Sequence, residues 1–564
     1  MRSKGDAGAR LGEMEAQSWF SRSAIHLVAI VILIIAMLAP RLPQAGMLGP
    51  TQPQWFGRSQ EFIAAIAAHR FRDTYQQAHP GVMLMWVMGV AHAVVTRVTG
   101  PLTQPLTVRV CTIAYILWVT ALLLLFYWAL QRTLRDYGEG AERAAWIALL
   151  VSLMIALSPS FLAMGGAVNL DAPLGLGMLI TTCLVLSATR SQRPADAAAA
   201  GIAAGLSLLT KVPAVAVTAA ALMWLLASGL HQYRRTGSRR AFAPGIVFGA
   251  ACAATVFVCW PALWVAPLET LLQIVLTPEQ EAALQAGRFS EMVVDPQLST
   301  GHVLESMLWP HKPDNSSVLY GKISAPWQYY PAVLLFKTAA ASLVLAAVGA
   351  ALTFHRRWRA GDRMLRLLAA TLVFGLIYFV AMSLGAKKTW RYMVPFQMFI
   401  EVWAGLASVA LVRAAAARGW GTGAAAGIGA ALVLQSAYAL ADAPHFFTYY
   451  NPLLGGRSVA EQYLQLYWSE GTGEAARYLQ ANARRLPVCF AAEHSVYEHV
   501  AILLDQPPAN CAANEFLIVS RREVLARTLP ALSERYWHER TPEHVVQLNG
   551  IPYLWIYRVA AAPI

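Results

Sequence analysis

The stretch Thr51-Gln-Pro-Gln-Trp-Phe-Gly-Arg-Ser-Gln-Glu-Phe62, with Asp73-Thr-Tyr-Gln-Gln-Ala-His-Pro-Gly-Val82 after it, decides how this chain is organised. Both pieces belong to a polar, aromatic loop from Arg41 to about Leu106, which follows the first apolar run, Ala24 to Ala39. The apolar runs around the loop place it between membrane spans. The side of the membrane on which this loop lies therefore fixes where the later polar segments lie.

The composition is that of a membrane protein that crosses the bilayer many times. The chain has 564 residues, of which 57% are hydrophobic and 13% are charged, whereas a soluble protein carries about 25% charged residues. The net charge of +13 comes largely from Lys and Arg in short loops between apolar runs. That pattern is typical of loops that stay in the cytoplasm, so we expect no nucleic-acid partner. The sequence contains no CxxC or Cys/His cluster, and we expect no metal site of that kind.

The basic loops also fix the topology. If residues 81–98 crossed the membrane, every later basic loop would face outward, against the positive-inside rule. If residues 81–98 lie at the interface, all of these loops fall inside. We therefore predict an α-helical polytopic protein with about eleven spans, a cytoplasmic N-terminus and an outward-facing first loop and C-terminus. Pro40-Arg41-Leu42-Pro43 lacks a small-x-small cleavage site, so we expect the first helix to be retained. The apolar runs lie near residues 24–39, 107–131, 144–163, 172–189, 197–209, 212–230, 244–264, 331–354, 365–384, 394–413 and 422–441.

Two parts of different composition follow from this topology. Residues 1–441 form the membrane module, with a first outer loop at about 41–106 and a second at about 265–328. Residues 442–564 form a small α/β domain outside the membrane. Its expected strands include Val545–Leu548, and Asn549-Gly550 predicts a type I′ hairpin turn. Cys489 and Cys511 in this domain are able to form a disulfide if the domain faces an oxidising space.

Cations occur at the outer ends of several spans. Lys387, Lys388 and Arg391 lie together at one outer mouth, Lys211 lies between two apolar runs, and Arg109 begins another span. Cations in such places need an anionic partner or open water. Binding of a phosphate group and ordinary snorkelling of long side chains to the membrane edge both account for them.

Acidic residues at the outer face are few. Asp171, in Asn169-Leu-Asp-Ala-Pro, is either a helix N-cap or an acid that handles substrate or protons; the spacing favours the cap. Asp73 in the first loop is a second candidate, with a solvated turn residue as the alternative. His79 precedes Pro80 and is expected in extended backbone, where a lone histidine is usually structural.

Nine motifs, in order, carry a resemblance to a known family. The chain resembles the polyprenyl-phosphate-dependent glycosyltransferases of the C-type fold, and within them family 39, which contains protein O-mannosyltransferases and lipid A aminoarabinose transferases. The resemblance covers most of the chain. The motifs are Trp55-Phe-Gly-Arg-Ser, Thr74-Tyr-Gln-Gln-Ala-His-Pro-Gly-Val, Leu170-Asp-Ala-Pro-Leu, Gly205-Leu-Ser-Leu-Leu-Thr-Lys-Val-Pro, Trp260-Pro-Ala-Leu-Trp, Ala325-Pro-Trp-Gln-Tyr-Tyr-Pro, Ala386-Lys-Lys-Thr-Trp-Arg-Tyr-Met-Val-Pro, Tyr449-Tyr-Asn-Pro-Leu-Leu-Gly-Gly and Trp468-Ser-Glu-Gly.

The resemblance implies a sugar donor linked to a polyprenyl phosphate, an acceptor glycan, lipid or protein, and a reaction at the outer face of the plasma membrane. A divalent cation is a possible cofactor. Asp171 matches a family acid near the site and is our first catalytic candidate, followed by Asp73. The residues expected to bind the donor are Lys211, Lys387, Lys388, Arg391, Tyr392, Arg109, Arg58, Tyr75 and His79.

The first loop departs from the family pattern at one position. The family carries an Asp-Glu pair a few residues before the Trp, and its Asp is taken as the base that deprotonates the acceptor; here Thr51-Gln52 stand there. Neither side chain accepts a proton at neutral pH. Two hypotheses follow: a membrane glycosyltransferase that uses another acid, or a non-catalytic relative that binds a lipid-linked sugar or a partner protein. A transporter is a third hypothesis, which the absence of a visible inverted repeat disfavours.

Overall fold

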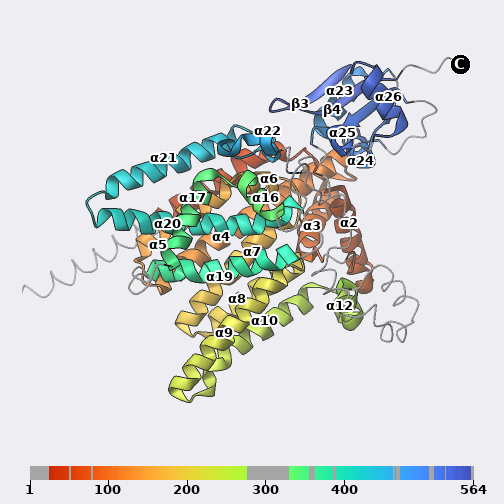
Figure 1. Ribbon diagram of the computed structural model, residues 1–564. Coiled ribbons are helices and arrows are strands. Elements are labelled where there is room, and N and C mark those ends of the chain that lie inside the picture. Colours follow the sequence, from red (N-terminus) through yellow and green to blue (C-terminus); the bar gives the residue numbers. More distant parts are fainter. Residues whose placement is uncertain are drawn as a thin grey trace, which may run out of the picture.

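The computed structural model describes residues 24–49, 52–77, 80–275, 329–354, 363–384, 389–460, 464, 470–484, 486–506, 514–526 and 529–559. Within these ranges, nine helices are long and apolar enough to cross a membrane, or ten if one bent pair counts as a span. The fold is the predicted one, a helical membrane module with a small C-terminal strand region (Figure 1). Its main helices are α4 (Gln104–Asp136), α5 (Ala141–Ala156), α7 (Asp171–Ser191), α8 (Pro194–Thr210), α9 (Ala214–Thr236), α10 (Ala243–Cys259), α19 (Arg363–Leu384), α20 (Val394–Ala416) and α21 (Gly421–Leu440).

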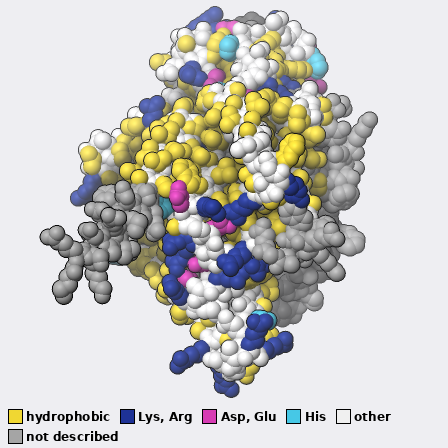
Figure 2. All heavy atoms as spheres, turned by 90° about the vertical axis from the view of Figure 1, so that its left-hand side faces the viewer, with side chains coloured by type: hydrophobic (Ala, Val, Ile, Leu, Met, Phe, Trp, Pro, Cys, Tyr) yellow, Lys and Arg dark blue, Asp and Glu magenta, His cyan; other side chains and the backbone are white. Residues whose placement is uncertain are grey.

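Three basic loops meet at one end of the bundle, which we call the basic end. Arg132 at the end of α4 pairs with Asp196 at the start of α8. The Arg413 guanidinium donates to both carboxylate oxygens of Glu139, each at 2.7 Å, and so joins the end of α20 to the loop after α4. Arginines gather on the face of the molecule that includes this end (Figure 2). The clustering agrees with the predicted grouping of the basic loops on one side of the membrane.

The opposite end, where α7 begins and α8 ends, is called the site end. Helix α3 (Val82–Thr99) has hydrogen-bonded contacts on both of its flanks. Before it, the Gly81 amide donates to the Thr210 carbonyl at 3.2 Å, and after it the Gln104 amide donates to Asp505 of the C-terminal domain at 2.8 Å. With α2 (Gln52–Ala67), α3 lies at the right-hand end of the bundle in Figure 1. Helix α3 is long and apolar enough to span a membrane, so the interfacial position of residues 81–98 stays a prediction.

The difference between about eleven predicted spans and nine or ten has a local cause. Helices α5, with 16 residues, and α8, with 17, fall short of the usual span length, yet each leads from the basic end to the site end. Helix α5 continues after a break into α6 (Pro159–Met164). A count of candidate spans by length and composition alone therefore includes α3 and leaves out α5 and α8.

The run predicted as one span at 331–354 is broken. Helix α16 (Tyr329–Lys337) and helix α17 (Ala340–Phe354) meet at an angle of 119°. Other segments bind the carbonyls freed at the end of α16: Asn451 donates to Leu335 and Phe336, and the Ser160 hydroxyl donates to Lys337. These hydrogen bonds make the break tolerable inside the protein, where an unsatisfied carbonyl is costly.

The C-terminal domain contains a four-stranded sheet in the order β1-β2-β4-β3. Strand β1 (Phe490–Ala491) pairs in parallel with β2 (Phe516–Ser520), and β4 (Ile551–Arg558) pairs antiparallel with both β2 and β3 (His544–Leu548). The predicted hairpin is confirmed, because Asn549 and Gly550 between β3 and β4 have φ values of 48° and 77°, as a type I′ turn requires. Helices α23 (Thr472–Asn482), α24 (His494–Leu503), α25 (Arg521–Ala526) and α26 (Ala531–Glu539) complete the domain.

The first residues after α21 contact both the membrane module and the hairpin of the sheet. The Lys337 ammonium donates to the carbonyls of Phe447 and Tyr449 at 2.8 and 3.0 Å. On the other side, the Asn549 side chain donates to the Asp442 carbonyl at 3.2 Å and to the Thr448 hydroxyl at 2.6 Å. Cys489 is disulfide-bonded, while Cys511 lies outside the described residues.

Candidate active site

A buried ion pair lies at the centre of the site end. The Lys211 ammonium donates to Oδ1 of Asp171 at 2.6 Å. The Lys211 side chain is 5% exposed and that of Asp171 is 2% exposed, so solvent does not screen the interaction between the two charges. Lys211 reaches this position because α8 ends at Thr210 and the Lys211 backbone is extended, with φ −161°. Two residues 40 positions apart thus share one site.

The pair excludes the capping role that spacing favoured for Asp171. Asp171 is the first residue of α7, and the oxygen that receives its backbone N–H belongs to Asn169, at 2.8 Å. The same Asn169 oxygen accepts from the Ala172 amide at 3.1 Å. Because Asn169 satisfies these free amides, the carboxylate of Asp171 is available to Lys211.

A second cation and an aromatic ring enclose the pair. Arg391 Nε lies 3.9 Å from Oδ2 of Asp171. The Lys211 ammonium lies 4.1 Å from the centre of the Tyr392 ring, within the range of a cation–π contact. Arg391 and Tyr392 are adjacent in the short helix η6 (Trp390–Met393), which leads into α20. The structure therefore brings together four predicted site residues: Asp171, Lys211, Arg391 and Tyr392.

An apolar groove begins beside this cluster and runs along α4, α7 and α8. Pro173 and Thr210, which are sequence neighbours of Asp171 and Lys211, line it near the pair. The groove encloses about 880 Å³ of empty space. Its remaining lining residues are Met83, Trp118, Leu122, Leu125, Trp128, Gly177, Ile180, Leu184, Ala199, Ile202, Ala203, Leu206 and Ser207. The groove thus offers an apolar surface whose lining includes close sequence neighbours of the charged pair.

The predicted residues of the first loop have partners of their own. The Tyr75 ring stacks on Trp260 at 6.2 Å, and its hydroxyl donates to the Gln273 carbonyl at 3.0 Å. Arg58 lies over the Trp55 ring at 5.0 Å. Asp73 forms an ion pair with Arg70 at 3.0 Å, in which both side chains are at least half exposed. None of these contacts joins the Asp171 cluster.

The other candidates are separate from the cluster or lie outside the described residues. Arg109 is exposed on the first turns of α4. His79, Lys387 and Lys388 lie outside the described residues, as does Thr51. Within the described part of the chain, no three His, Cys, Asp or Glu side chains are placed to hold a metal ion.

The sequence reading missed Lys337, which lies at the break between α16 and α17. Its ammonium is 3.6 Å from the centre of the Tyr450 ring and 5.3 Å from that of Trp390, the residue before Arg391. The side chain is buried. The sequence does contain a signal for it: a lysine inside the apolar run 331–354 is unusual, because charged residues within spans are costly and often functional.

Comparisons with known proteins were made for the whole chain. A crystal structure of ArnT from Cupriavidus metallidurans bound to undecaprenyl phosphate is similar over 95% of this chain and 99% of that one, with 13% identity and a TM-score of 0.45. The Archaeoglobus fulgidus oligosaccharyltransferase tethered with an acceptor peptide matches over 87% of this chain, with 12% identity and a TM-score of 0.44. The chain spans 64% of that oligosaccharyltransferase. No curated protein sequence matches the chain.

The family described as "Dolichyl-phosphate-mannose-protein mannosyltransferase" matches residues 110–260. This segment runs from the first turns of α4 to the end of α10 and contains both Asp171 and Lys211. Arg391, the first loop and the C-terminal domain lie outside it. On the match of residues 110–260, the resemblance to the C-type glycosyltransferases of the protein mannosyltransferase family is confirmed.

Proposed function

We propose that this chain is a plasma-membrane glycosyltransferase that moves a sugar from a polyprenyl-phosphate carrier to an acceptor at the site end. One observation carries the proposal: the buried Asp171–Lys211 pair, with Arg391 beside it, is close in sequence to Pro173 and Thr210, which line an apolar groove. A polyprenyl phosphate combines an anionic group with a long apolar chain, and this arrangement offers a place for each.

The charge balance of the cluster favours an anion. Lys211 and Arg391 carry two positive charges, and Asp171 carries one negative charge. Cations form strong, charge-assisted hydrogen bonds with phosphate oxygens, so two cations at one site favour a phosphate group as the ligand. We propose that Lys387 and Lys388, which precede Arg391 in sequence, add to this attraction. The C-terminal domain would then lie outside the membrane, where Cys489 is able to keep its disulfide.

The carrier chain fits the groove along α4, α7 and α8. The groove is lined mainly by apolar side chains, including two tryptophans. Because the tail would enter the groove from lipid rather than from water, van der Waals packing against these side chains would hold it, while the cations would hold the phosphate. A lipid in this groove would also bring the sugar to Asp171 and Lys211.

The reaction then follows from electrostatics and positioning. The acceptor oxygen bonds to the anomeric carbon, the bond from that carbon to the phosphate oxygen breaks, and polyprenyl phosphate leaves with the electron pair. Lys211 and Arg391 stabilise the charge that grows on the leaving phosphate. Asp171 holds both cations in place. Because Lys211 already occupies its carboxylate, Asp171 serves this positioning role better than that of a base, and Asp73 pairs with Arg70.

Binding of polyprenyl phosphate to the full chain in nanodiscs tests the donor site. Lys211→Ala removes a charge-assisted hydrogen bond, which is worth about 1.5–3 kcal/mol, and should weaken binding by about 10- to 150-fold. Arg97→Ala, which removes an exposed cation from the last turn of α3, is the control and should bind normally. Equal affinity of the wild type and Lys211→Ala would refute the donor site.

One observation favours the alternative of a non-catalytic binding protein. Gln52, at a position where the resemblance expects an acid, is buried, and its side-chain oxygen accepts the Gly49 amide. This residue shapes the loop and offers no base. Normal binding of polyprenyl-phosphate sugar without any transfer would establish the alternative.

A further inference from the structure

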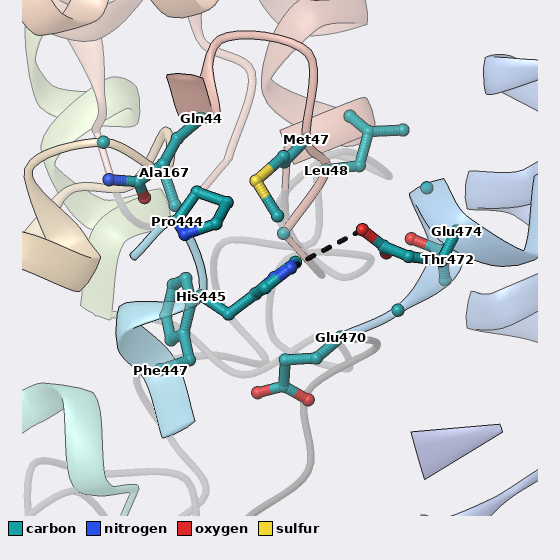
Figure 3. Close-up of a pocket in the computed structure, with 14 residues that line it drawn as sticks. Gln44, Met47, Leu48, Ala167, Pro444, His445, Phe447, Glu470, Thr472 and Glu474 are labelled. Atoms are coloured by element: carbon teal, nitrogen blue, oxygen red, sulfur yellow. Dashed lines mark ion pairs between the residues drawn. The ribbon is translucent and has the colours of Figure 1, made fainter. Parts of the chain in front are cut away.

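A pocket lies between the membrane module and the C-terminal domain, next to the beginning of the first loop. It encloses about 560 Å³ of empty space, part of it open to solvent. Met47, Leu48 and Gly49 form one side, and the start of α23 forms the other (Figure 3). Its remaining lining residues are Gln44, Gly166, Ala167, Pro444, His445, Phe447, Glu470, Gly471, Thr472, Gly473 and Glu474. The ionisable groups in this lining are two carboxylates and one imidazole.

One carboxylate oxygen of Glu474 contacts neighbouring side chains, and the other has no hydrogen-bond partner within the described residues. Its Oε1 accepts from Arg477 at 2.9 Å and lies 3.6 Å from Nε2 of His445, the pair marked in Figure 3. Its Oε2 is buried and has no hydrogen-bond partner within the described residues. A buried carboxylate oxygen without a donor is unfavourable. A ligand hydroxyl that donated a hydrogen bond to Oε2 would remove that cost.

The pocket adjoins the donor cluster along two short paths. Ala167 in its wall accepts a hydrogen bond from Asn169, whose oxygen also binds the Asp171 amide. Phe447 in its wall packs edge-to-face on Trp390, the neighbour of Arg391. The pocket and the ion pair are therefore adjacent at the site end.

The pocket also lies next to the part of the first loop where the family carries an Asp-Glu pair and this chain has Thr51 and Gln52. Leu48 and Gly49 in its wall directly precede the segment that contains Thr51 and Gln52. We infer that this pocket binds the hydroxyl-bearing acceptor and that Glu474, from the opposite wall, is the residue that takes the acceptor proton. The inference rests on the proposed function.

The step balances with no further reactant. The acceptor O–H bond breaks and its proton goes to Oε2 of Glu474. The acceptor oxygen bonds to the anomeric carbon, and polyprenyl phosphate departs with the electron pair of the broken carbon–oxygen bond. Arg477 and His445 keep the carboxylate in place from its other oxygen.

The neighbouring charges suit this role. Burial lowers the pKa of His445, and this effect exceeds the opposing one of Glu474, so the imidazole is neutral at pH 7 and Arg477 is the cation that balances Glu474. Glu470 points away from Glu474 in Figure 3, and its charge acts on Lys337. Glu474 is therefore the carboxylate that faces the pocket beside His445.

Transfer by the full chain in liposomes tests the inference. The donors are polyprenyl phosphates that carry radiolabelled mannose or aminoarabinose, and the acceptor is the envelope fraction of a host strain that lacks the chain. Glu474→Gln should lower kcat by about 10²–10⁴-fold, the usual contribution of a general base. Polyprenyl-phosphate binding should stay normal in this variant. Glu474→Asp should recover part of the rate.

Two further variants separate the role from folding. Glu539→Gln changes an exposed glutamate that pairs with Arg535 in the same domain, and it should transfer at the wild-type rate. Gly473 lines the pocket with open space at its Cβ position, so Gly473→Leu should raise the KM for acceptor and leave lipid-phosphate binding intact.

Three results would count against the proposals. Removal of a general base should lower the rate by about 10²-fold or more. If Glu474→Gln keeps a rate within about threefold of the wild type, this inference alone is overturned. An unchanged acceptor KM in Gly473→Leu also overturns it. No transfer by the wild type from either donor overturns the proposed function itself.

Discussion

The Asp171–Lys211 pair makes a quantitative prediction about stability. Removing one partner of a buried ion pair costs about 3–5 kcal/mol, because the other charge is left uncompensated, whereas replacing both partners is often close to neutral. Arg391 makes the two single changes unequal. Asp171→Asn removes the carboxylate that both the buried Lys211 and the partly buried Arg391 face, and it should cost about 5 kcal/mol. Lys211→Met leaves Asp171 with Arg391 at 3.9 Å and should cost about 3 kcal/mol.

The double variant measures the coupling. With both changes, only Arg391 remains charged, and its side chain is 21% exposed. We therefore expect the double variant to be no less stable than Asp171→Asn alone, which corresponds to a coupling energy of about 3 kcal/mol. The free energy of unfolding is measured by titrating SDS into mixed micelles and following tryptophan fluorescence.

The exposed pair Arg70–Asp73, at 3.0 Å, is the control. Its coupling in the same cycle should be below about 1 kcal/mol. Additive costs for Asp171→Asn and Lys211→Met, with a coupling no larger than that of the control, would refute the buried pair.

Three further predictions concern the membrane module. Arg41 is fully buried and donates to the carbonyls of Ala156 and Phe161 at 2.7 and 3.1 Å; Arg41→Met leaves both carbonyls without this donor, so it should cost about 2 kcal/mol or more, and unchanged SDS unfolding would contradict this. Single cysteines introduced by Gly100→Cys and Arg135→Cys should react with an impermeant maleimide from opposite sides of the membrane, Gly100→Cys from outside; labelling of both from one side would refute the interfacial α3. Ala203→Trp fills the apolar groove and should weaken binding of a long polyprenyl phosphate but not of inorganic phosphate, and an equal loss for both probes would exclude a tail in the groove.

Sequence patterns predicted the features that local or one-dimensional rules control. Apolar runs predicted a helical membrane module, because a span needs about 20 apolar residues. Asn549-Gly550 predicted its turn, because the two residues themselves favour positive φ. The number of spans was predicted less well, since α5 and α8 have only 16 and 17 residues and α3 is itself long and apolar enough to span.

The site was predicted in part. Asp171, Lys211, Arg391 and Tyr392 were all named from their place at span ends, and the structure brings them together. The capping role of Asp171 was wrong because spacing does not reveal that Asn169 supplies the capping oxygen. Glu474 had no local signal: its importance depends on a pocket wall that lies more than 400 residues earlier in the chain.

One segment, residues 444–451, supports both halves of the proposed reaction. Within it, His445 and Phe447 line the acceptor pocket, and the carbonyls of Phe447 and Tyr449 bind Lys337. Lys337 in turn lies against Trp390, next to the cation that faces Asp171. Since Lys337 also ends the broken helix α16, a shift of this segment would move both the pocket wall and the support of Arg391. The buried lysine thus ties the position of the acceptor pocket to that of the donor cluster, which a transfer between two separately bound substrates requires.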